Sequence, residues 1–478
     1  METIPKTYRY VEIAQNIEHQ ILDGVLKLGD KLPSVRILKQ EYGVSVSTIL
    51  QAYYRLEAKS LVESRPRSGY YVVYCSLNVP ESPIKTNPNR YSVKGTATEM
   101  IIDFYQYLSN DAIVNLSLGV PSAELLPIAK LNKTMHETIS QLPAGGTYYD
   151  NIYGSIKLRR QIAQRTLLWG GNLTEDDLLI TAGCTSALSL SLMAVTKPGD
   201  TVVVESPVFY GILQLANTLG LRVIELPTDS DTGIDLDALR EVFKKMTVHA
   251  ILLVANFNNP LGSVMPDAHK REVVRLIHQY QIPLIEDDIC GDIYYGNKRP
   301  GTCKSFDKNG LVLWVGSFSK TIAGGYRVGW VAPGRYLAEV MKLKLYLSSS
   351  TATIPQETIA NLLANGRYDH HLRRLRQTLH ANSMKYIGAI GTYFPKDTRV
   401  SKPQGSFLLW VAFNEKIDTR ELYEQALACG IMITPGHLFT LQDQYRNCMR
   451  LSYGMLWNDR IDGALKQLGT LAKAQLAT

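Results

Sequence analysis

Apolar side chains near the beginning of the chain recur at the spacing of an amphipathic helix. One helical face collects Tyr10, Ile13, Ala14, Ile17 and Ile21. Gly24 follows the last of them, and glycine suits the left-handed residue at which many helices end. The pattern predicts a first helix that buries this face and ends before Gly24.

Two shorter helices are predicted next, each with a serine at its beginning. Ser34 can cap a helix from Val35 to Tyr42, and Gly43 suits its left-handed end. Ser45 can cap a third helix, because a serine in this position accepts a hydrogen bond from a free backbone N–H. The apolar face of that helix is formed by Ile49, Ala52, Tyr53 and Leu56. A tight turn therefore joins the second helix to the third.

A β-hairpin is expected after the third helix. Residues 61–64 and 70–73 are rich in strand-forming residues, and the turn between them contains Arg65, Arg67 and Gly69. Three helices followed by a basic-tipped hairpin form a winged helix-turn-helix. In that fold the second helix of the pair enters the major groove of DNA, and the wing reaches the backbone or the minor groove.

The hydrophobic periodicity then stops and resumes in a different form. We expect the winged helix-turn-helix to cover residues 1–75 and a linker, with three prolines among polar residues, to cover residues 76–105. From residue 106 to residue 478, short β-rich runs alternate with helical stretches. The clearest runs are Thr201–Glu205, Ala250–Ala255, Pro283–Glu286 and Leu311–Val315. The alternation predicts an α/β domain with a mostly parallel sheet covered by helices.

Composition and charge agree with an ordinary globular protein. Hydrophobic residues make up 45% of the 478-residue chain and charged residues 20%, which excludes a disordered or collagen-like chain. The formal net charge of +7 permits an anionic partner such as DNA without requiring one. The six cysteines contain no C-x-x-C pair, so we expect reduced thiols, no metal site and a cytoplasmic location. We expect no membrane span and no secretory signal.

The strongest chemical signal follows the β-rich run that ends at Val315. Lys320 stands here among the hydroxyl residues Ser317 and Ser319, and Arg327 comes shortly afterwards. A lysine in this position can hold an aldehyde cofactor as a Schiff base, while hydroxyl groups and a bidentate arginine bind its phosphate. The same run also fits a surface lysine in a serine-rich loop. The motif alone leaves both interpretations open.

Other β-rich runs end in side chains that would complete such a site, since open α/β sheets bind ligands beyond the carboxyl ends of their strands. Asp288 could hold a proton on a pyridine nitrogen, and Asn259 could bond a phenolic oxygen. Gly183, Cys184 and Thr185 could offer a helix N-terminus to a phosphate. Together these residue types predict a site for a phosphorylated pyridine.

Two further side chains fit the same ligand. Phe209 follows another β-rich run and could stack on a planar ring, and Arg450, near the end of the chain, suits a substrate carboxylate. Each element alone is weak evidence, because aromatic residues usually belong to the core and paired acids usually face solvent. The order of the elements along the chain is the specific signal.

The front module resembles the GntR-type regulators. The L-P-S-x-R and V-S-x-x-T-[IV] elements of that family recur in order, within a match over roughly residues 8–73. The resemblance implies contacts to double-stranded DNA from Ser34, Arg36, Ser45, Ser47 and Thr48 of the helices and from Arg65, Arg67 and Gly69 of the wing. Many relatives have arginines where this chain has Val46 and Leu50, which shifts base readout to hydroxyl and thymine-methyl contacts.

The chain over roughly residues 110–475 resembles the fold type I aminotransferases that depend on pyridoxal 5'-phosphate. The resemblance implies a mostly parallel sheet with a smaller C-terminal α+β subdomain. Lys320 and Asp288 would be the catalytic residues, the first as the Schiff-base lysine and the second as the partner of the pyridine nitrogen. Asn259 would bond the ring oxygen and Phe209 would stack on the ring.

The same resemblance implies the remaining site residues. The phosphate would be bound by Gly183, Cys184, Thr185, Ser317, Ser319 and Arg327. Arg450 would bind the carboxylate of an amino acid. Tyr149 would reach the phosphate of a partner subunit, although Asn151 stands where relatives often have proline.

A GntR-like winged helix joined by a linker to an aminotransferase-like domain resembles the MocR branch of bacterial regulators. The resemblance implies a homodimer that senses an amino compound or pyridoxal 5'-phosphate and binds a promoter. The alternative is a working aminotransferase that acts on amino acids and carries the winged helix as an appendage. In MocR-like relatives a tyrosine of the run E-D-D-x-Y-G-D bonds the ring oxygen, whereas this chain has Cys290, which favours sensing.

Overall fold

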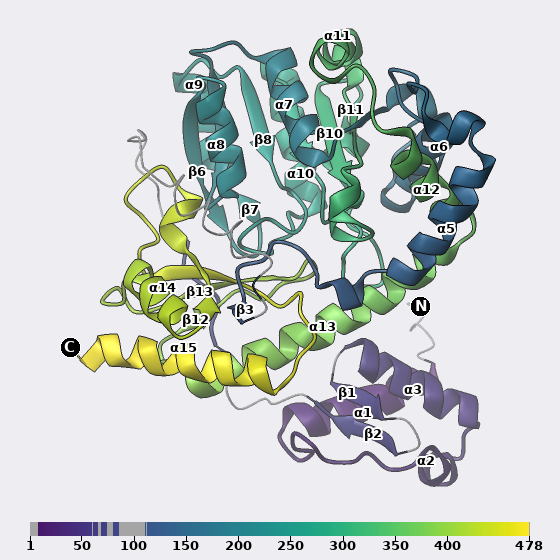
Figure 1. The fold of residues 1–478 in the computed structure, drawn as a ribbon. Coiled ribbons are helices and arrows are strands. Elements are labelled where there is room, and N and C mark those ends of the chain that lie inside the picture. The colour runs from purple at the N-terminus through teal and green to yellow at the C-terminus, as the bar shows by residue number, and fades with distance from the viewer. Residues whose placement is uncertain are drawn as a thin grey trace, which may run out of the picture.

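The structure has three parts along the chain: a small front module, a large α/β lobe and a smaller C-terminal lobe (Figure 1). It is a computed structural model. The residues that it describes are 8–59, 61–65, 68–73, 80–85, 110 and 112–477.

The front module contains the predicted three helices and hairpin. They are α1 (Arg9–Leu22), α2 (Val35–Tyr42), α3 (Val46–Ala58), β1 (Val62–Arg65) and β2 (Gly69–Val72). Ser34 accepts a hydrogen bond from the Ile37 N–H, and Gly43 ends α2 at a φ of 62°. The predicted face of α3, which includes Ile49 and Leu56, has no exposed surface and packs against α1. The winged helix-turn-helix is thus confirmed.

The large lobe is built on an eight-stranded sheet in the order β4-β11-β10-β9-β8-β5-β6-β7. The strands are β4 (Leu179–Thr181), β5 (Thr201–Ser206), β6 (Arg222–Asp229), β7 (Gly233–Ile234), β8 (Ala250–Leu253), β9 (Leu284–Asp287), β10 (Val312–Ser317) and β11 (Gly329–Ala332). Neighbours from β10 to β6 are parallel, while β11 and β7 run antiparallel to their neighbours. The mostly parallel sheet is confirmed.

Helices cover both faces of this sheet, which explains why its strands are continuous apolar runs. The helices are α7 (Cys184–Val195), α8 (Tyr210–Thr218), α9 (Leu236–Lys245), α10 (Asp267–Tyr280) and α11 (Leu337–Ser348). Val202 and Val204 of β5 pack in one core with α7, α8 and α11. Val203, which points the other way, packs with α9 and α10.

The C-terminal lobe is the smaller α+β subdomain that the sequence led us to expect. Its antiparallel sheet has the order β12-β13-β16-β15, with β12 (Arg399–Val400), β13 (Leu408–Ala412), β15 (Thr434–Pro435) and β16 (Cys448–Ser452). A separate parallel pair joins β3 (Val114–Asn115) to β14 (Ile431–Met432).

The remaining helices of the two lobes are α5 (Ile128–Gln141), α6 (Ile156–Thr166), α12 (Thr353–Ala364), α13 (Arg367–Tyr393), α14 (Thr419–Ala428) and α15 (Asp459–Ala477).

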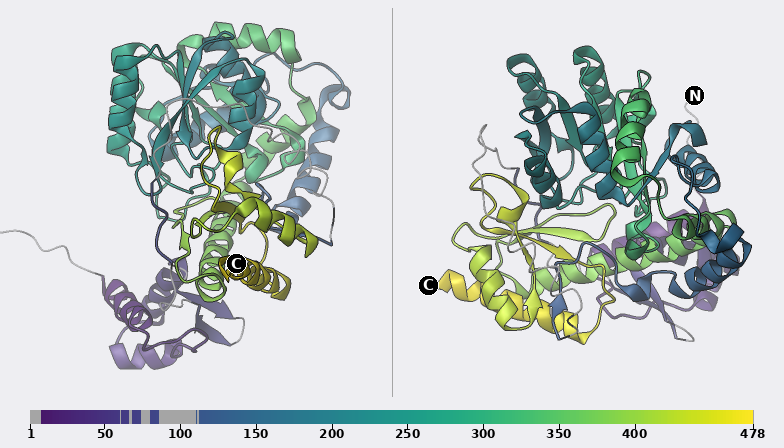
Figure 2. Two further views of the ribbon diagram at one scale, coloured as in Figure 1. Left: turned by 90° about the vertical axis from the view of Figure 1, so that its left-hand side faces the viewer. Right: turned by 45° about the horizontal axis from the view of Figure 1, so that its top comes forward.

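The front module lies beside the long helix α13 (Figure 2). An ion pair of 3.9 Å joins Lys385 of α13 to Glu63 of the wing strand β1. Both side chains are about one-third exposed, so this ion pair contributes little stability.

The packing of α3 generates a prediction about stability. Leu56→Ala removes buried side-chain atoms from the centre of the module and should lower its free energy of unfolding by about 2–5 kcal/mol. Because a chain of several parts need not unfold in one step, the measurement is hydrogen exchange of peptides from α1 and α3 in the full chain. Tyr54→Ala, at a side chain that is 56% exposed, is the control, with a change of about 0.5 kcal/mol or less. Equal exchange in the two variants would contradict this packing.

Candidate functional site

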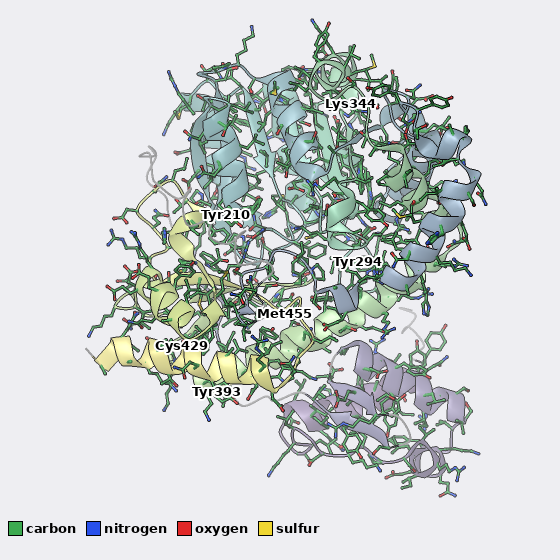
Figure 3. All side chains as sticks on the ribbon, in the orientation of Figure 1. Tyr210, Tyr294, Lys344, Tyr393, Cys429 and Met455 are labelled. Carbon is green, nitrogen blue, oxygen red and sulfur yellow. The ribbon has the colours of Figure 1, made fainter. Side chains whose placement is uncertain are left out.

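The carboxyl ends of the parallel strands border a cavity of about 610 Å³ between the two lobes. Its volume is within the range of about 300–1,000 Å³ that small-molecule sites occupy. The predicted site residues that line it are Cys184, Thr185, Phe209, Asn259, Ser319, Lys320, Arg327 and Arg450. Tyr210 also lines it and marks the boundary between the lobes in Figure 3. Segments far apart in the sequence therefore converge as expected.

Lys320 lies in a short 3₁₀ turn, Phe318–Lys320, directly after β10. Its Nζ donates a hydrogen bond to the carbonyl oxygen of Gly119. Burial lowers the pKa of Lys320 because desolvation disfavours the ammonium form, and the Arg450 guanidinium lowers it further. Both effects increase the fraction of free amine, which is the form that attacks an aldehyde.

An anion cradle lies beside Lys320. Gly183 precedes α7 at a φ of 86°. The first N–H groups of a helix have no partner within it, so those of α7 can bind an anion at this point. The Arg327 guanidinium lies over this point, since a Cβ at Gly183 would come within 2.5 Å of Arg327 Nη2. Ser319 lines the cavity, while Ser317 lies behind Ser319. A hydrogen bond of 2.7 Å joins Ser317 Oγ to Ser319 Oγ. Ser317 thus orients Ser319 rather than lining the cavity itself.

The structure corrects the assignment of the acidic residue. Asp287, at the end of β9, lines the cavity, whereas Asp288 borders a separate space of about 30 Å³. Successive residues of an extended chain point to opposite sides, so only one of the two can face the cavity. Burial raises the pKa of Asp287 to about 6, although it accepts hydrogen bonds from the Ile289 N–H at 3.0 Å and from Cys184 Sγ at 3.5 Å.

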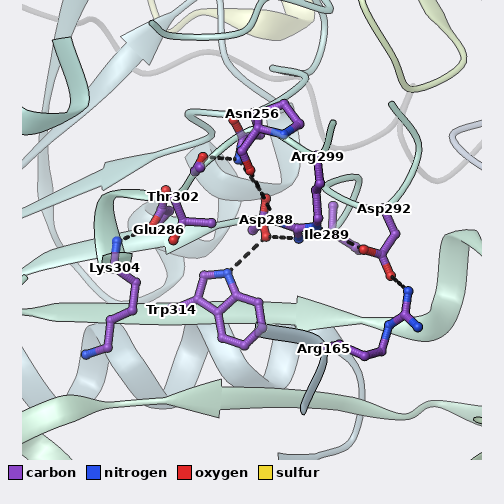
Figure 4. A network of polar contacts seen from close by, with 12 residues as sticks. Arg165, Asn256, Glu286, Asp288, Ile289, Asp292, Arg299, Thr302, Lys304 and Trp314 are labelled. Carbon is purple, nitrogen blue, oxygen red and sulfur yellow. Dashed lines mark hydrogen bonds and ion pairs between the residues drawn. The ribbon is translucent and has the colours of Figure 1, made fainter. Parts of the chain in front are cut away.

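Asp288 belongs to a buried polar network (Figure 4). Its carboxylate accepts hydrogen bonds from Arg299 Nη2 at 2.5 Å, Trp314 Nε1 at 3.0 Å and Asn256 Nδ2 at 3.1 Å. Arg299 Nε also donates to Asp292 at 2.9 Å. No motif in the sequence pointed to Arg299, because its partners come from the fold rather than from neighbouring positions.

The network continues on both sides of Arg299. Arg165 Nη2 donates to Asp292 at 3.2 Å. Burial by itself raises the pKa of Asp292, but the guanidinium groups of Arg165 and Arg299 outweigh it and hold this pKa well below its usual range. On the other side, the buried Lys270 donates to Asn256 Oδ1 at 2.7 Å. The chain after β9 is therefore held by ion pairs and hydrogen bonds on the side that faces away from the cavity.

Cys290, which stands where MocR-like relatives have a tyrosine, lines the cavity. Burial raises the pKa of its thiol to about 11, and Ser406 Oγ lies 3.5 Å from Sγ. Tyr210 supplies a phenol to the same cavity, whereas the nearby Tyr294 borders other spaces. The thiol is neutral at ordinary pH and is not activated as a nucleophile.

Arg450 lies on β16 and is almost completely buried, with 1% of its surface exposed. Its guanidinium donates to Asn259 Oδ1 at 3.0 Å, to the Ser117 carbonyl at 2.6 Å and to Thr434 Oγ1 at 3.2 Å. Sequence reasoning missed Ser117 and Thr434, since a carbonyl and a threonine carry no recognisable pattern. These contacts fix the guanidinium of Arg450, which belongs to the C-terminal lobe, at one end of the cavity.

Tyr149 does not belong to the cavity of its own chain. Its side chain is 89% exposed, on the segment between α5 and α6. This exposed side chain can contact a second chain. It makes no contact with Lys320 of its own chain. Its role therefore stays a prediction.

The hydroxyl groups predicted to contact DNA gather at the beginning of α3. Ser45 Oγ caps the helix by accepting from the Thr48 N–H at 3.2 Å and lies 2.7 Å from Ser47 Oγ. Arg36 is exposed on α2, whereas Arg65 is ion-paired with Glu63 at 2.8 Å. Gly69 begins β2 at a φ of 112°, and Arg67 lies outside the described residues.

No group of three or more His, Cys, Asp or Glu side chains among the described residues could hold a metal ion. None of the helices described is long and apolar enough to cross a membrane.

Comparisons with known proteins agree with this geometry. Residues 111–468 match the family "Aminotransferase class I and II", and residues 9–72 match "Bacterial regulatory proteins, gntR family". The HTH-type transcriptional regulator YjiR of Escherichia coli (strain K12) is 40% identical over 96% of this chain and 98% of its own. YdcR of the same strain is 34% identical over 98% of this chain and 100% of its own.

A solved structure shares the fold of the two lobes. Pyrococcus horikoshii kynurenine aminotransferase has a TM-score of 0.74 and 25% identity, over 80% of this chain and 96% of that chain. The chain therefore belongs to the class I and II aminotransferase family and joins that domain to a GntR winged helix, which is the architecture of the MocR-type regulators.

Proposed function

We propose that this protein is a DNA-binding transcriptional regulator whose aminotransferase-like domain binds pyridoxal 5'-phosphate and senses an amino compound. One observation carries the proposal: a single chain combines a winged helix with a cavity that presents a lysine, an anion cradle and a carboxylate-binding arginine. The relatives YjiR and YdcR are named as HTH-type transcriptional regulators. An enzyme has no use for the serine-capped helix and the basic wing.

The donor set of the cavity fits pyridoxal 5'-phosphate. The α7 N-terminus and Arg327 supply N–H donors for a phosphate, at a glycine where a Cβ would collide with the guanidinium. Asp287 is an acid at the required end of a strand, and the aromatic side chain of Phe209 lines the same cavity. When bound, the pyridine ring supplies an electron sink for charge that develops on an amino substrate.

The residues of this chain then have distinct tasks. Lys320 supplies the amine, and Asp287 takes the role first assigned to Asp288, that of holding a proton at the pyridine nitrogen. Asn259 bonds the ring oxygen and is held in turn by Arg450. Arg450 binds the carboxylate of the effector. Ser319 completes the phosphate contacts beside the cradle, and Ser317 orients it through the hydrogen bond between their Oγ atoms.

The winged helix binds the promoter through the beginning of α3 and through the wing. Ser47 and Thr48 are directed to the DNA by the cap that Ser45 forms, and Arg36 and Arg65 contact phosphates. Arg65 exchanges its ion pair with Glu63 for a phosphate contact. We further propose a cytoplasmic homodimer in which Tyr149 reaches the cofactor phosphate of the partner chain. Turnover as an aminotransferase is the alternative outcome of the test.

The first prediction concerns the cofactor. Full-length protein mixed with pyridoxal 5'-phosphate and reduced with borohydride should carry a stable adduct on the peptide that contains Lys320. Lys320→Ala should abolish this adduct, because no other lysine lines the cavity among the described residues. Mass spectrometry of the digested protein locates the adduct.

The control for this experiment is Lys197→Ala, at an exposed lysine outside the cavity. It should leave the labelled peptide unchanged. An adduct at full yield in the Lys320→Ala protein would refute the assignment. Amino-group transfer from a panel of amino acids, measured on the same preparation, decides whether the protein also turns over.

The second prediction concerns DNA. Arg36→Ala and Arg65→Ala should each weaken binding to the DNA upstream of the gene and lower the slope of log affinity against log salt by about one unit. Fluorescence anisotropy at a series of salt concentrations measures both. Arg275→Ala, which removes an exposed arginine from α10, is the matched control. Unchanged slopes in both wing and helix variants would rule out this docking of the module.

A further inference from the structure

Every charged side chain that lines the cavity already has a task in the proposed function. The charged residues among its described lining are Asp287, Lys320, Arg327 and Arg450. Arg327 lies at the anion cradle, Lys320 supplies the amine, and Arg450 takes one carboxylate. A second carboxylate or a second ammonium group on the ligand would therefore meet no counter-charge from the described residues of this chain.

The segment from Ser117 to Val120 forms the wall between the lysine and the arginine. The Ser117 carbonyl accepts a hydrogen bond from Arg450, and the Gly119 carbonyl accepts one from Lys320. Leu118 stands between these two contacts and lines the cavity. An α-amino acid holds its amino and carboxylate groups on one carbon. A ligand whose amino group lies at Lys320 and whose carboxylate binds Arg450 therefore places its α-carbon, and the side chain on it, beside this wall.

We infer that the effector is a monocarboxylic amino acid with an uncharged, apolar side chain, and that Leu118 selects it. The inference rests on the proposed function. The apolar residues Val120, Phe407 and Leu408 line the same cavity as Leu118. An apolar side chain gains from leaving water there, whereas a charged one loses its hydration without a partner.

The test is isothermal titration of the full-length protein, loaded with pyridoxal 5'-phosphate, with leucine, methionine, glutamate and lysine. Leucine and methionine should bind at least about ten times more tightly than glutamate and lysine. Leu118→Arg should reverse the order of leucine and glutamate by supplying a cation for the second carboxylate. Leu22→Arg, at an exposed leucine of α1, carries the same change of charge and should leave the order unchanged.

Tighter binding of glutamate or lysine to the wild-type protein would overturn the inference, as would an unchanged order in Leu118→Arg. The proposed function fails differently. Its failure would be the absence of the borohydride-stable adduct at Lys320, whatever the order of the amino acids.

A second, independent observation concerns residues 80–85, which contact both lobes. On the C-terminal lobe, the Val400 N–H of β12 donates to the Glu81 carbonyl at 2.7 Å, and Arg399 pairs with the Glu81 carboxylate at 3.1 Å. On the large lobe, Lys85 pairs with Asp235, the residue that caps α9. The segment thus bridges the two lobes that border the cavity (Figure 1).

A short path leads from this segment to the cavity. Val400 of β12 pairs with Val411 of β13, and the preceding residue, Trp410, pairs with Arg450 of β16. Arg450 is the cavity residue of the C-terminal lobe, while Lys320 and Arg327 belong to the large lobe. A ligand held by all three fixes the distance between the lobes, and the Glu81 and Lys85 contacts depend on that distance.

We propose that residues Glu81–Lys85 transmit occupation of the cavity to the winged helix. Pro80 follows Val73, the last described residue of the wing region, after only a short stretch of chain. A displacement of the segment therefore changes the space open to the winged helix. The weak ion pair between Glu63 and Lys385 does not resist such a change.

The test compares DNA affinity of the full-length protein without ligand, with pyridoxal 5'-phosphate, and with pyridoxal 5'-phosphate plus leucine. Ligand should change the wild-type affinity at least about five-fold, and Lys85→Met should reduce this change to less than two-fold while the cofactor still binds. Lys245→Met, which removes the exposed ion pair with Glu241 on α9, is the matched control.

A charge exchange provides the second variant. Glu81→Arg alone should reduce the coupling, and Glu81→Arg combined with Arg399→Glu should restore it by re-forming the ion pair. Full coupling in Lys85→Met and Glu81→Arg would overturn the proposal. So would a wild-type DNA affinity that neither pyridoxal 5'-phosphate alone nor its combination with leucine changes.

Discussion

The ion pairs of Arg299 with Asp288 and Asp292 hold the chain that leaves β9, and the cavity depends on them. Asp287 and Cys290 face the cavity only while Asp288 between them is fixed on the opposite side. The carboxylate of Asp288 is satisfied there by a guanidinium, an indole N–H and an amide. Removing the charged partner, Arg299, leaves a buried carboxylate uncompensated, at a cost of about 3–5 kcal/mol. The network fixes geometry more than it adds net stability.

Local sequence rules predicted the parts of the fold that depend on neighbouring residues. Ser34 and Ser45 cap their helices, and Gly43 adopts the left-handed conformation, because each need is set within a few residues. The mostly parallel sheet followed from apolar runs alternating with helices. The antiparallel placement of β11 did not, since it depends on which strand the chain returns to after the turn at Lys320.

The candidate site could be predicted only as far as residue type and order allow. Lys320, Arg327 and Arg450 converge as the order of motifs implied. The choice between Asp287 and Asp288 required the direction of each side chain, which two adjacent aspartates in a sequence do not reveal. Arg299 was beyond prediction because no motif links it to Asp288, although the two lie only 11 residues apart. Ser117 and residues 80–85 were beyond prediction because their partners are distant in sequence and the contacts use a backbone carbonyl and a strand edge.

A cavity of this kind serves an enzyme and a sensor equally well, so the difference between them must lie outside it. A ligand shifts a conformational equilibrium only by its difference in affinity for the two states. Here Arg450 belongs to one lobe and Lys320 to the other, which makes affinity depend on how the lobes are placed. In an isolated aminotransferase, the placement of the lobes that favours binding only encloses the substrate. In this chain the same two lobes are also joined by Glu81 and Lys85, so the placement that favours the ligand is coupled to the position of the DNA-binding module.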